Sequence, residues 1–373
     1  MSRRNSSIEL MRLLACLSVI AIHVGMPAWL NGEVELPALT VACVTGDAVA
    51  VFFSITGCFW FTSAKGFGRS VLDFLRGILL PALLTVLASS LLADWLKSPG
   101  FAPVLSSPDW SSLWQGLIHL NADLWPAICG HLWYVFVMGE LLLARPIVRL
   151  FVQKKLHWPL YLLMAGDLLL RLLQELSLLN PDWGWRIPVL PYAFPALAEM
   201  LLGWFLWQRR EQLAKKKWLP LAGAAGFLAV TALRVWVQQG FYLRFGYGLM
   251  QYWNRSFSLL ILLSLYCVFL PLKLPERLGQ VICRLAACSF GVYLIHVAVI
   301  EKLTYLPSPV PGTGCLIWLQ AFFASLTGSL WMNRLLYALF SALLIFAICA
   351  VPVFLWQLTR RKVASLWKKV GKS

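Results

Sequence analysis

The sequence has little charge and few histidines, and it lacks the short motifs of several common enzyme classes. Only 13% of its 373 residues are charged, and only five are histidine. It contains no GxSxG elbow, no HExxH motif and no glycine-rich phosphate loop, since the terminal Gly371-Lys372-Ser373 lacks the earlier glycine of such a loop. These absences exclude an α/β-hydrolase, a zinc protease of the HExxH type and a P-loop nucleotide hydrolase.

The cysteines also lack any pattern typical of a metal or disulfide framework. There are nine of them, with no CxxC pair and no regular spacing, and most lie within apolar runs. Cysteine in such surroundings behaves as a small apolar side chain. We therefore expect no metal site.

The sequence is instead rich in apolar residues. It is 60% hydrophobic and 14% aromatic, with a mean hydropathy of +0.73, which is more apolar than a soluble domain of this length requires. We predict an all-α fold, a polytopic integral membrane protein with about ten transmembrane helices. The expected spans lie at about 8–30, 41–64, 71–96, 131–152, 158–176, 192–208, 218–239, 256–272, 284–302 and 335–357.

The basic residues alternate between the predicted loops, and this alternation gives an orientation. Six regions on one side, including both ends of the chain, hold 22 of the 32 lysines and arginines. The positive-inside rule therefore places both termini in the cytoplasm, and an even number of spans satisfies this. The net charge of +16 then indicates membrane orientation and not nucleic-acid binding. We expect a membrane domain over 1–357 and a basic cytoplasmic tail over 358–373.

The first predicted span carries three ionisable residues, Glu9, Arg12 and His23. Arg12 and His23 are eleven residues apart, a rotation of about 1,100°, so they share one helix face about 16 Å apart. Glu9 can pair with Arg12. A signal peptide is the alternative for this stretch, but its length and Arg12 favour an uncleaved span. The histidine could simply hydrogen-bond a neighbouring helix, yet ionisable groups are costly enough inside lipid to favour a functional role.

Two further histidines are predicted in the same outer half of the membrane as His23. His131 opens the fourth span, and His296 lies near the outer end of the ninth, about 18 Å above Arg284. Chance would scatter the histidines more widely. We therefore expect these three imidazoles to contribute to one site.

Asp47 and Arg76 are candidates for the same site. Asp47 enters the second span from the outer side, where it could orient an imidazole or could be a solvated charge at the loop edge. Arg76, at the cytoplasmic end of the third span, could join Arg12 in binding phosphates or could form a surface ion pair.

Other ionisable residues are expected to be structural. Asp167, Arg171 and Glu175 follow one another at intervals of four, which predicts a self-neutralising row on one helix face. Glu199 and Arg234 are isolated in the sixth and seventh spans. We expect them to pair with one another or with the site.

Four sequence patterns resemble the membrane acyltransferase-3 family, and the resemblance extends from about residue 3 to residue 357. They are Arg12-x10-His23, Phe52-Phe53-x-x-Thr56-Gly57, His131-Leu132-Trp133-Tyr134 with Pro146, and Ser289-x-Gly291-x-Tyr293-Leu294-x-His296. Thr56 stands where the family usually has serine, and the family's arginine pair before the proline of the third span is reduced to Arg76. The chain has no room for the esterase-like domain that some members carry.

The resemblance implies an O-acyltransferase of the bacterial inner membrane. It would move an acyl group, in most members acetyl, from cytoplasmic acetyl-CoA to a hydroxyl of a cell-surface polysaccharide or its lipid-linked precursor. Arg12 and Arg76 would hold the CoA phosphates. His23 would act as general base or carry the acyl group, with His131 and His296 as relay groups.

Two other classes of membrane protein are alternatives to an acyltransferase. A transporter or flippase for lipid-linked glycans would also line its path with buried charges and histidines, but the sequence shows no repeated halves with interrupted helices. A passive membrane scaffold leaves the intramembrane charges unexplained.

Overall fold

The computed structural model describes residues 5–24, 29–30, 33–125, 127–179, 193–246 and 255–370. Arg3 and Arg4, most of the expected outer loop at 177–191 and the second half of the one at 240–255 lie outside these residues. The statements below concern the described parts of the chain.

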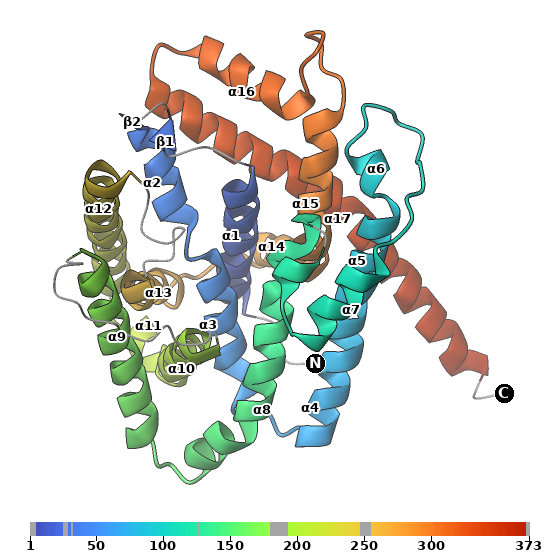
Figure 1. Cartoon of the computed structure of the whole chain (residues 1–373). Coiled ribbons are helices and arrows are strands. Elements are labelled where there is room, and N and C mark those ends of the chain that lie inside the picture. Colours follow the sequence, from blue (N-terminus) through green and yellow to red (C-terminus); the bar gives the residue numbers. More distant parts are fainter. Residues whose placement is uncertain are drawn as a thin grey trace.

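The fold is a bundle of helices arranged around α1 (Figure 1). Helix α1 contacts α2, α3, α13, α14, α15 and α17, so residues on several of its faces meet other helices and not lipid. The helices are α1 (Ser6–His23), α2 (Leu36–Thr45), α3 (Ala48–Trp60), α4 (Phe67–Phe74), α5 (Leu80–Leu91), α6 (Ala93–Leu96), α7 (Trp110–Ile118), α8 (Trp133–Gln153), α9 (Trp158–Leu179), α10 (Ala193–Gln208), α11 (Arg210–Ala214), α12 (Leu219–Phe245), α13 (Arg255–Phe269), α14 (Glu276–Ala286), α15 (Ser289–Tyr305), α16 (Cys315–Leu326) and α17 (Leu330–Val370).

Short irregular elements complete the described chain. A π-helical turn, η1 (Leu75–Leu79), joins α4 to α5, and two 3-10 turns, η2 (Ala122–Leu124) and η3 (Ala127–Leu132), precede α8. The strands β1 (Trp29–Leu30) and β2 (Glu33–Val34) pair antiparallel after α1.

The helices confirm an all-α membrane-embedded protein. Five continuous stretches are long and apolar enough to cross a membrane: Ser6–His23, Leu36–Trp60, Phe67–Leu91, Leu219–Phe245 and Leu330–Thr359. A sixth is formed if α14 and α15, which are bent by 54° at their junction, are taken as one broken span. Every one of the ten predicted segments contains a helix, but the number of spans and the cytoplasmic position of the termini remain predictions.

The boundaries of two predicted spans differ in the structure. Helix α1 ends at His23, with Val24 as its C-cap, and does not continue to Leu30. Gly25 and Pro27 follow in the sequence, and both residue types disfavour helix. His23 is therefore at the end of its helix.

The ninth span also begins later than predicted. Arg284 belongs to the separate helix α14, and α15 begins at Ser289. Four polar residues of α14, Glu276, Arg277, Gln280 and Arg284, recur at the spacing of one helix face, which is typical of an amphipathic surface helix. His296 therefore lies seven residues, about 10 Å, from the start of α15.

The C-terminal boundary is a further difference. Helix α17 continues from Leu330 to Val370, so the expected tail after Gln357 is an extension of the last helix through Val370. Figure 1 shows this end of α17 projecting away from the bundle.

The close packing of α3 on α10 depends on two glycines. A Cβ atom at Gly57 would lie 1.9 Å from the carbonyl oxygen of Met200, and one at Gly203 would lie 2.0 Å from the carbonyl oxygen of Ser54. Membrane helices commonly use small residues in this way to bring their backbones together. The contact fixes α3, which carries Phe52 and Thr56 to the site described next.

Candidate active site

Three imidazole rings meet in the interior of the bundle. His23 ends α1, His131 lies in η3 just before α8, and His296 lies in α15. The ring centroids are 5.1 Å apart for His23 and His296, 6.0 Å for His23 and His131, and 4.9 Å for His131 and His296. His296 is fully buried and His131 is 9% exposed, whereas His23 is exposed. His23 is therefore the imidazole most accessible to an incoming molecule.

The backbone carbonyl of Tyr293 binds two of these rings. It lies 3.1 Å from Nε2 of His131 and 2.7 Å from Nδ1 of His296. A carbonyl oxygen can only accept hydrogen bonds, so both nitrogens must carry a hydrogen. The phenolic hydroxyl of Tyr293 donates in turn to the backbone carbonyl of His131.

This arrangement fixes the tautomers of the two rings. When neutral, His131 keeps its lone pair on Nδ1, and His296 keeps its lone pair on Nε2. Both of these nitrogens are buried and have no hydrogen-bond partner among the described residues. The site thus holds two oriented imidazoles, each with a free basic nitrogen, next to the more accessible His23.

A narrow cavity of about 240 Å³ lies beside this cluster, and both Arg12 and Tyr293 line it. Its walls come from α1, α3, α8 and the junction of α14 with α15. They consist of Arg12, Val49, Phe52, Thr56, Tyr134, Ala286, Ala287, Ser289, Phe290 and Tyr293. Tyr293 joins the cavity to the cluster, because its ring lies 5.4 Å from that of His131 and 5.9 Å from that of His296.

Arg12 is partly neutralised at one edge of its guanidinium. Its Nη1 atom donates to both carboxylate oxygens of Glu9, at 3.0 and 2.9 Å, as the sequence spacing predicted. The side chain of Arg12 is 25% exposed and that of Glu9 is 8% exposed. Nη2 and Nε of Arg12 have no partner among the described residues and remain available to a ligand.

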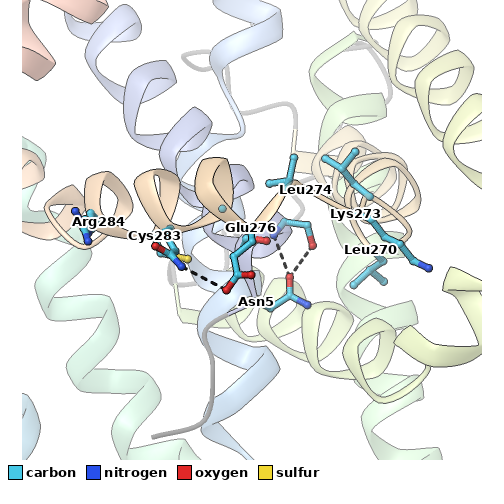
Figure 2. Close-up of a pocket in the computed structure, with 12 residues that line it drawn as sticks. Asn5, Leu270, Lys273, Leu274, Glu276, Cys283 and Arg284 are labelled. Atoms are coloured by element: carbon cyan, nitrogen blue, oxygen red, sulfur yellow. Dashed lines mark hydrogen bonds between the residues drawn. The ribbon is translucent and has the colours of Figure 1, made fainter.

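A second and larger cavity, of about 790 Å³, lies at the start of α1 beside α14 (Figure 2). Asn5 caps α1 here, since its Oδ1 accepts from the backbone nitrogens of Ser7 and Ile8 at 3.1 and 3.2 Å. The lining is mainly polar and includes two basic residues. It consists of Asn5, Ser6, Ser7, Leu270, Leu272, Lys273, Leu274, Glu276, Gly279, Gln280, Cys283 and Arg284.

The structure brings together three of the predicted site residues, His23, His131 and His296, places Arg12 in the lining of the neighbouring cavity, and leaves out two. Asp47 does not face an imidazole or solvent. Its carboxylate is 5% exposed and accepts from Arg234 at 2.6 and 3.0 Å and from Ser258 at 2.6 Å. A carboxylate committed to a buried guanidinium is a structural ion pair, so the catalytic role predicted for Asp47 is not retained.

Arg76 is the other predicted residue that lies apart. It sits in the π-helical turn η1 with an exposed side chain, and it lines neither of the two cavities described above. The distorted turn points it away from the bundle interior. Its predicted part in binding CoA beside Arg12 is therefore unsupported.

The remaining buried charges confirm the predicted pair of Asp167 with Arg171 but otherwise pair differently from the prediction. Arg171 lies 2.7 Å from Asp167 and 3.4 Å from Glu199. Glu175 does not complete the row on α9, because it accepts instead from the side chain and backbone of Ser256. Glu199 and Arg234, expected as partners, each pair with another residue.

The sequence analysis did not assign roles to four cavity residues, Thr56, Tyr134, Ser289 and Tyr293. All four lie in the sequence patterns quoted above, so the signal was present. Backbone interactions carry no side-chain signature, and the role of the Tyr293 carbonyl could be found only from the structure.

These features define a multi-pass helical membrane protein with three imidazoles gathered beside a narrow cavity. The family model described as an acyltransferase domain, that of the acyltransferase-3 family, matches residues 5–351, nearly the whole chain. The chain therefore belongs to the acyltransferase-3 family and is an acyltransferase. Comparisons with curated proteins and with solved structures gave no match.

Proposed function

We propose that the protein transfers an acetyl group from acetyl-CoA to a hydroxyl of a cell-surface glycan or its lipid-linked precursor, in the bacterial inner membrane. The observation that carries this proposal is the narrow cavity lined by Arg12 and by Tyr293, whose backbone carbonyl contacts two rings of the imidazole cluster. A thioester carrier entering beside Arg12 would bring its acyl group to His23 and His296, where an acceptor could be deprotonated.

The two cavities suit the two ends of the donor. The nucleotide end of CoA is large and anionic, and the larger cavity is lined by Lys273 and Arg284. Phosphates are recognised by such groups through charge-assisted hydrogen bonds. The narrow cavity, with aromatic walls, suits the slender and uncharged pantetheine arm. We therefore assign phosphate binding to Lys273 and Arg284 in place of Arg76.

His23 is the proposed general base. It takes the proton of the acceptor hydroxyl as the oxygen bonds to the acyl carbon, the carbon–sulfur bond breaks, and the protonated imidazole returns a proton to the departing thiolate. His296, 5.1 Å away, supports this step through its free Nε2. In the alternative route His23 itself carries the acyl group, and labelled protein would then accumulate with donor alone.

The test is transfer of labelled acetyl from acetyl-CoA to extracted glycan by the purified protein in detergent. His23→Ala should reduce transfer by about 10²- to 10⁴-fold, the usual contribution of a positioned base. His119→Ala is the matched control, because His119 is an exposed C-cap of α7. Normal transfer by His23→Ala would refute the assignment of the base.

The same assay distinguishes the transporter alternative. A transporter or flippase would move the glycan without adding a group, so no label would reach it. Mass spectrometry of surface polysaccharide with and without the gene should show a difference of one acetyl group per modified residue.

A further inference from the structure

One buried polar group in the narrow cavity has no function so far. Ser289 is 2% exposed and lines the cavity, and its hydroxyl has no oxygen or nitrogen partner among the described residues; its polar neighbour is the thiol of Cys16, which is only a weak hydrogen-bonding group. Burying a hydroxyl without a partner is unfavourable, and such groups in native proteins usually bind a ligand or an ordered water. The hydroxyl is therefore a candidate contact for a bound molecule.

Its surroundings favour a ligand that accepts hydrogen bonds. Ser289 is the first residue of the 17-residue helix α15, so the first backbone N–H groups of that helix have no intrahelical acceptor. Arg12 lines the same cavity and offers Nη2 and Nε, while Glu9 occupies its Nη1. The hydroxyl, the start of the helix and the guanidinium are all hydrogen-bond donors, and Ser289 and Arg12 line the same cavity.

The remaining walls favour an uncharged acceptor over a phosphate. Val49, Phe52 and Phe290 are apolar, and Glu9 neutralises the one cationic side chain among the lining residues. A volume of about 240 Å³ is also small for a nucleotide. An amide carbonyl in a thin chain fits both conditions.

We propose that Ser289 binds the amide of the donor's pantetheine arm that is farther from the sulfur. This inference rests on the proposed function. Ser289 precedes His296 by seven residues, about 10 Å along α15. The carbonyl carbon of that amide is eight bonds from the sulfur. An extended chain spans about 3.3–3.6 Å for every three bonds, so the two atoms are about 9 Å apart when the arm is extended. A donor held at Ser289 thus places its thioester at the imidazoles.

The experiment compares three acetyl donors in the transfer assay. They are acetyl-CoA, S-acetylpantetheine, which lacks the nucleotide, and S-acetyl-N-acetylcysteamine, which lacks the second amide. For Ser289→Ala we expect KM to rise about 2- to 10-fold with the first two donors, the usual effect of one hydrogen bond. The shortest donor should react equally with the variant and the original protein.

The control is Ser341→Ala, because Ser341 is a fully buried serine of α17 that lines neither cavity. Unchanged KM for acetyl-CoA and S-acetylpantetheine in Ser289→Ala would overturn the inference and leave the proposed function intact. A rise with acetyl-CoA alone would also overturn it, since Ser289 would then contact a phosphate. If the original protein transfers acetyl from none of the donors, the proposed function itself fails and the inference fails with it.

Discussion

The double hydrogen bond to the Tyr293 carbonyl allows the chemical and structural roles of His296 to be separated. An asparagine side chain can place an amide N–H where the Nδ1–H of histidine lies, but it has no basic nitrogen at the Nε2 position. His296→Asn should therefore keep the hydrogen bond to Tyr293 while removing the free lone pair. His296→Ala removes both.

The expected magnitudes differ by role. Loss of a group that assists proton transfer costs about 10²- to 10⁴-fold in rate, or about 3 to 5 kcal/mol in the barrier. Loss of one hydrogen bond costs about 0.5–1.5 kcal/mol of folding stability. We expect both variants to lose transfer by at least about 10²-fold, and only His296→Ala to unfold at a clearly lower temperature.

The assay pairs acetyl transfer with thermal unfolding of the same detergent-solubilised samples. His131→Gln is a parallel variant, since glutamine can place an N–H at the Nε2 position while removing Nδ1. Full activity of His296→Asn would refute the reasoning. It would show that the ring of His296 serves only as a hydrogen-bond donor to Tyr293.

Three further predictions concern the scaffold and its orientation. Asp47→Ala should lower the free energy of unfolding by about 3–5 kcal/mol, because the buried guanidinium of Arg234 loses its carboxylate partner, and removing both partners should recover part of the loss in denaturation of the purified protein. Gly203→Ala should lower the unfolding temperature and Gly166→Ala should not, because a Cβ at Gly166 meets nothing within 4 Å; equal effects would contradict the packing argument. A membrane-impermeant maleimide should label Cys315 from outside intact cells, and this labelling should be absent in Cys315→Ala. Labelling only after permeabilisation would reverse the predicted orientation.

The sequence predicted the helices well because each span must be apolar over its whole length. Helices were therefore expected at all ten segments, and all ten contain helix in the structure. The ends were harder to predict. Hydropathy did not reveal that α1 ends at His23, because Gly25 and Pro27 lie within an apolar run and do not interrupt it. It also did not reveal the 54° bend between α14 and α15.

The sequence predicted the main residues of the site but not the contacts between them. Rarity made the histidines conspicuous, and helical spacing placed Arg12 and His23 on one side of α1. Pairing between distant charges was not predictable, since several partners were equally compatible with the sequence. Arg234 could have joined Glu199 or the site, and only the fold shows that it binds Asp47.

The charge distribution argues for a division of the donor between the two cavities. Arg12 is the cation of the narrow cavity, and Glu9 already neutralises it, so a phosphate there would be taken from water without a matching charge. Lys273 and Arg284 have exposed side chains in the larger cavity, where solvation lowers that cost, and together they outweigh the one acidic residue of its lining, Glu276. In the proposed reaction, an uncharged arm would extend from the larger cavity toward the imidazoles without carrying charge into the membrane interior. On this argument, replacing Arg284 should weaken donors that carry phosphate, and replacing Ser289 should weaken those that carry the second amide.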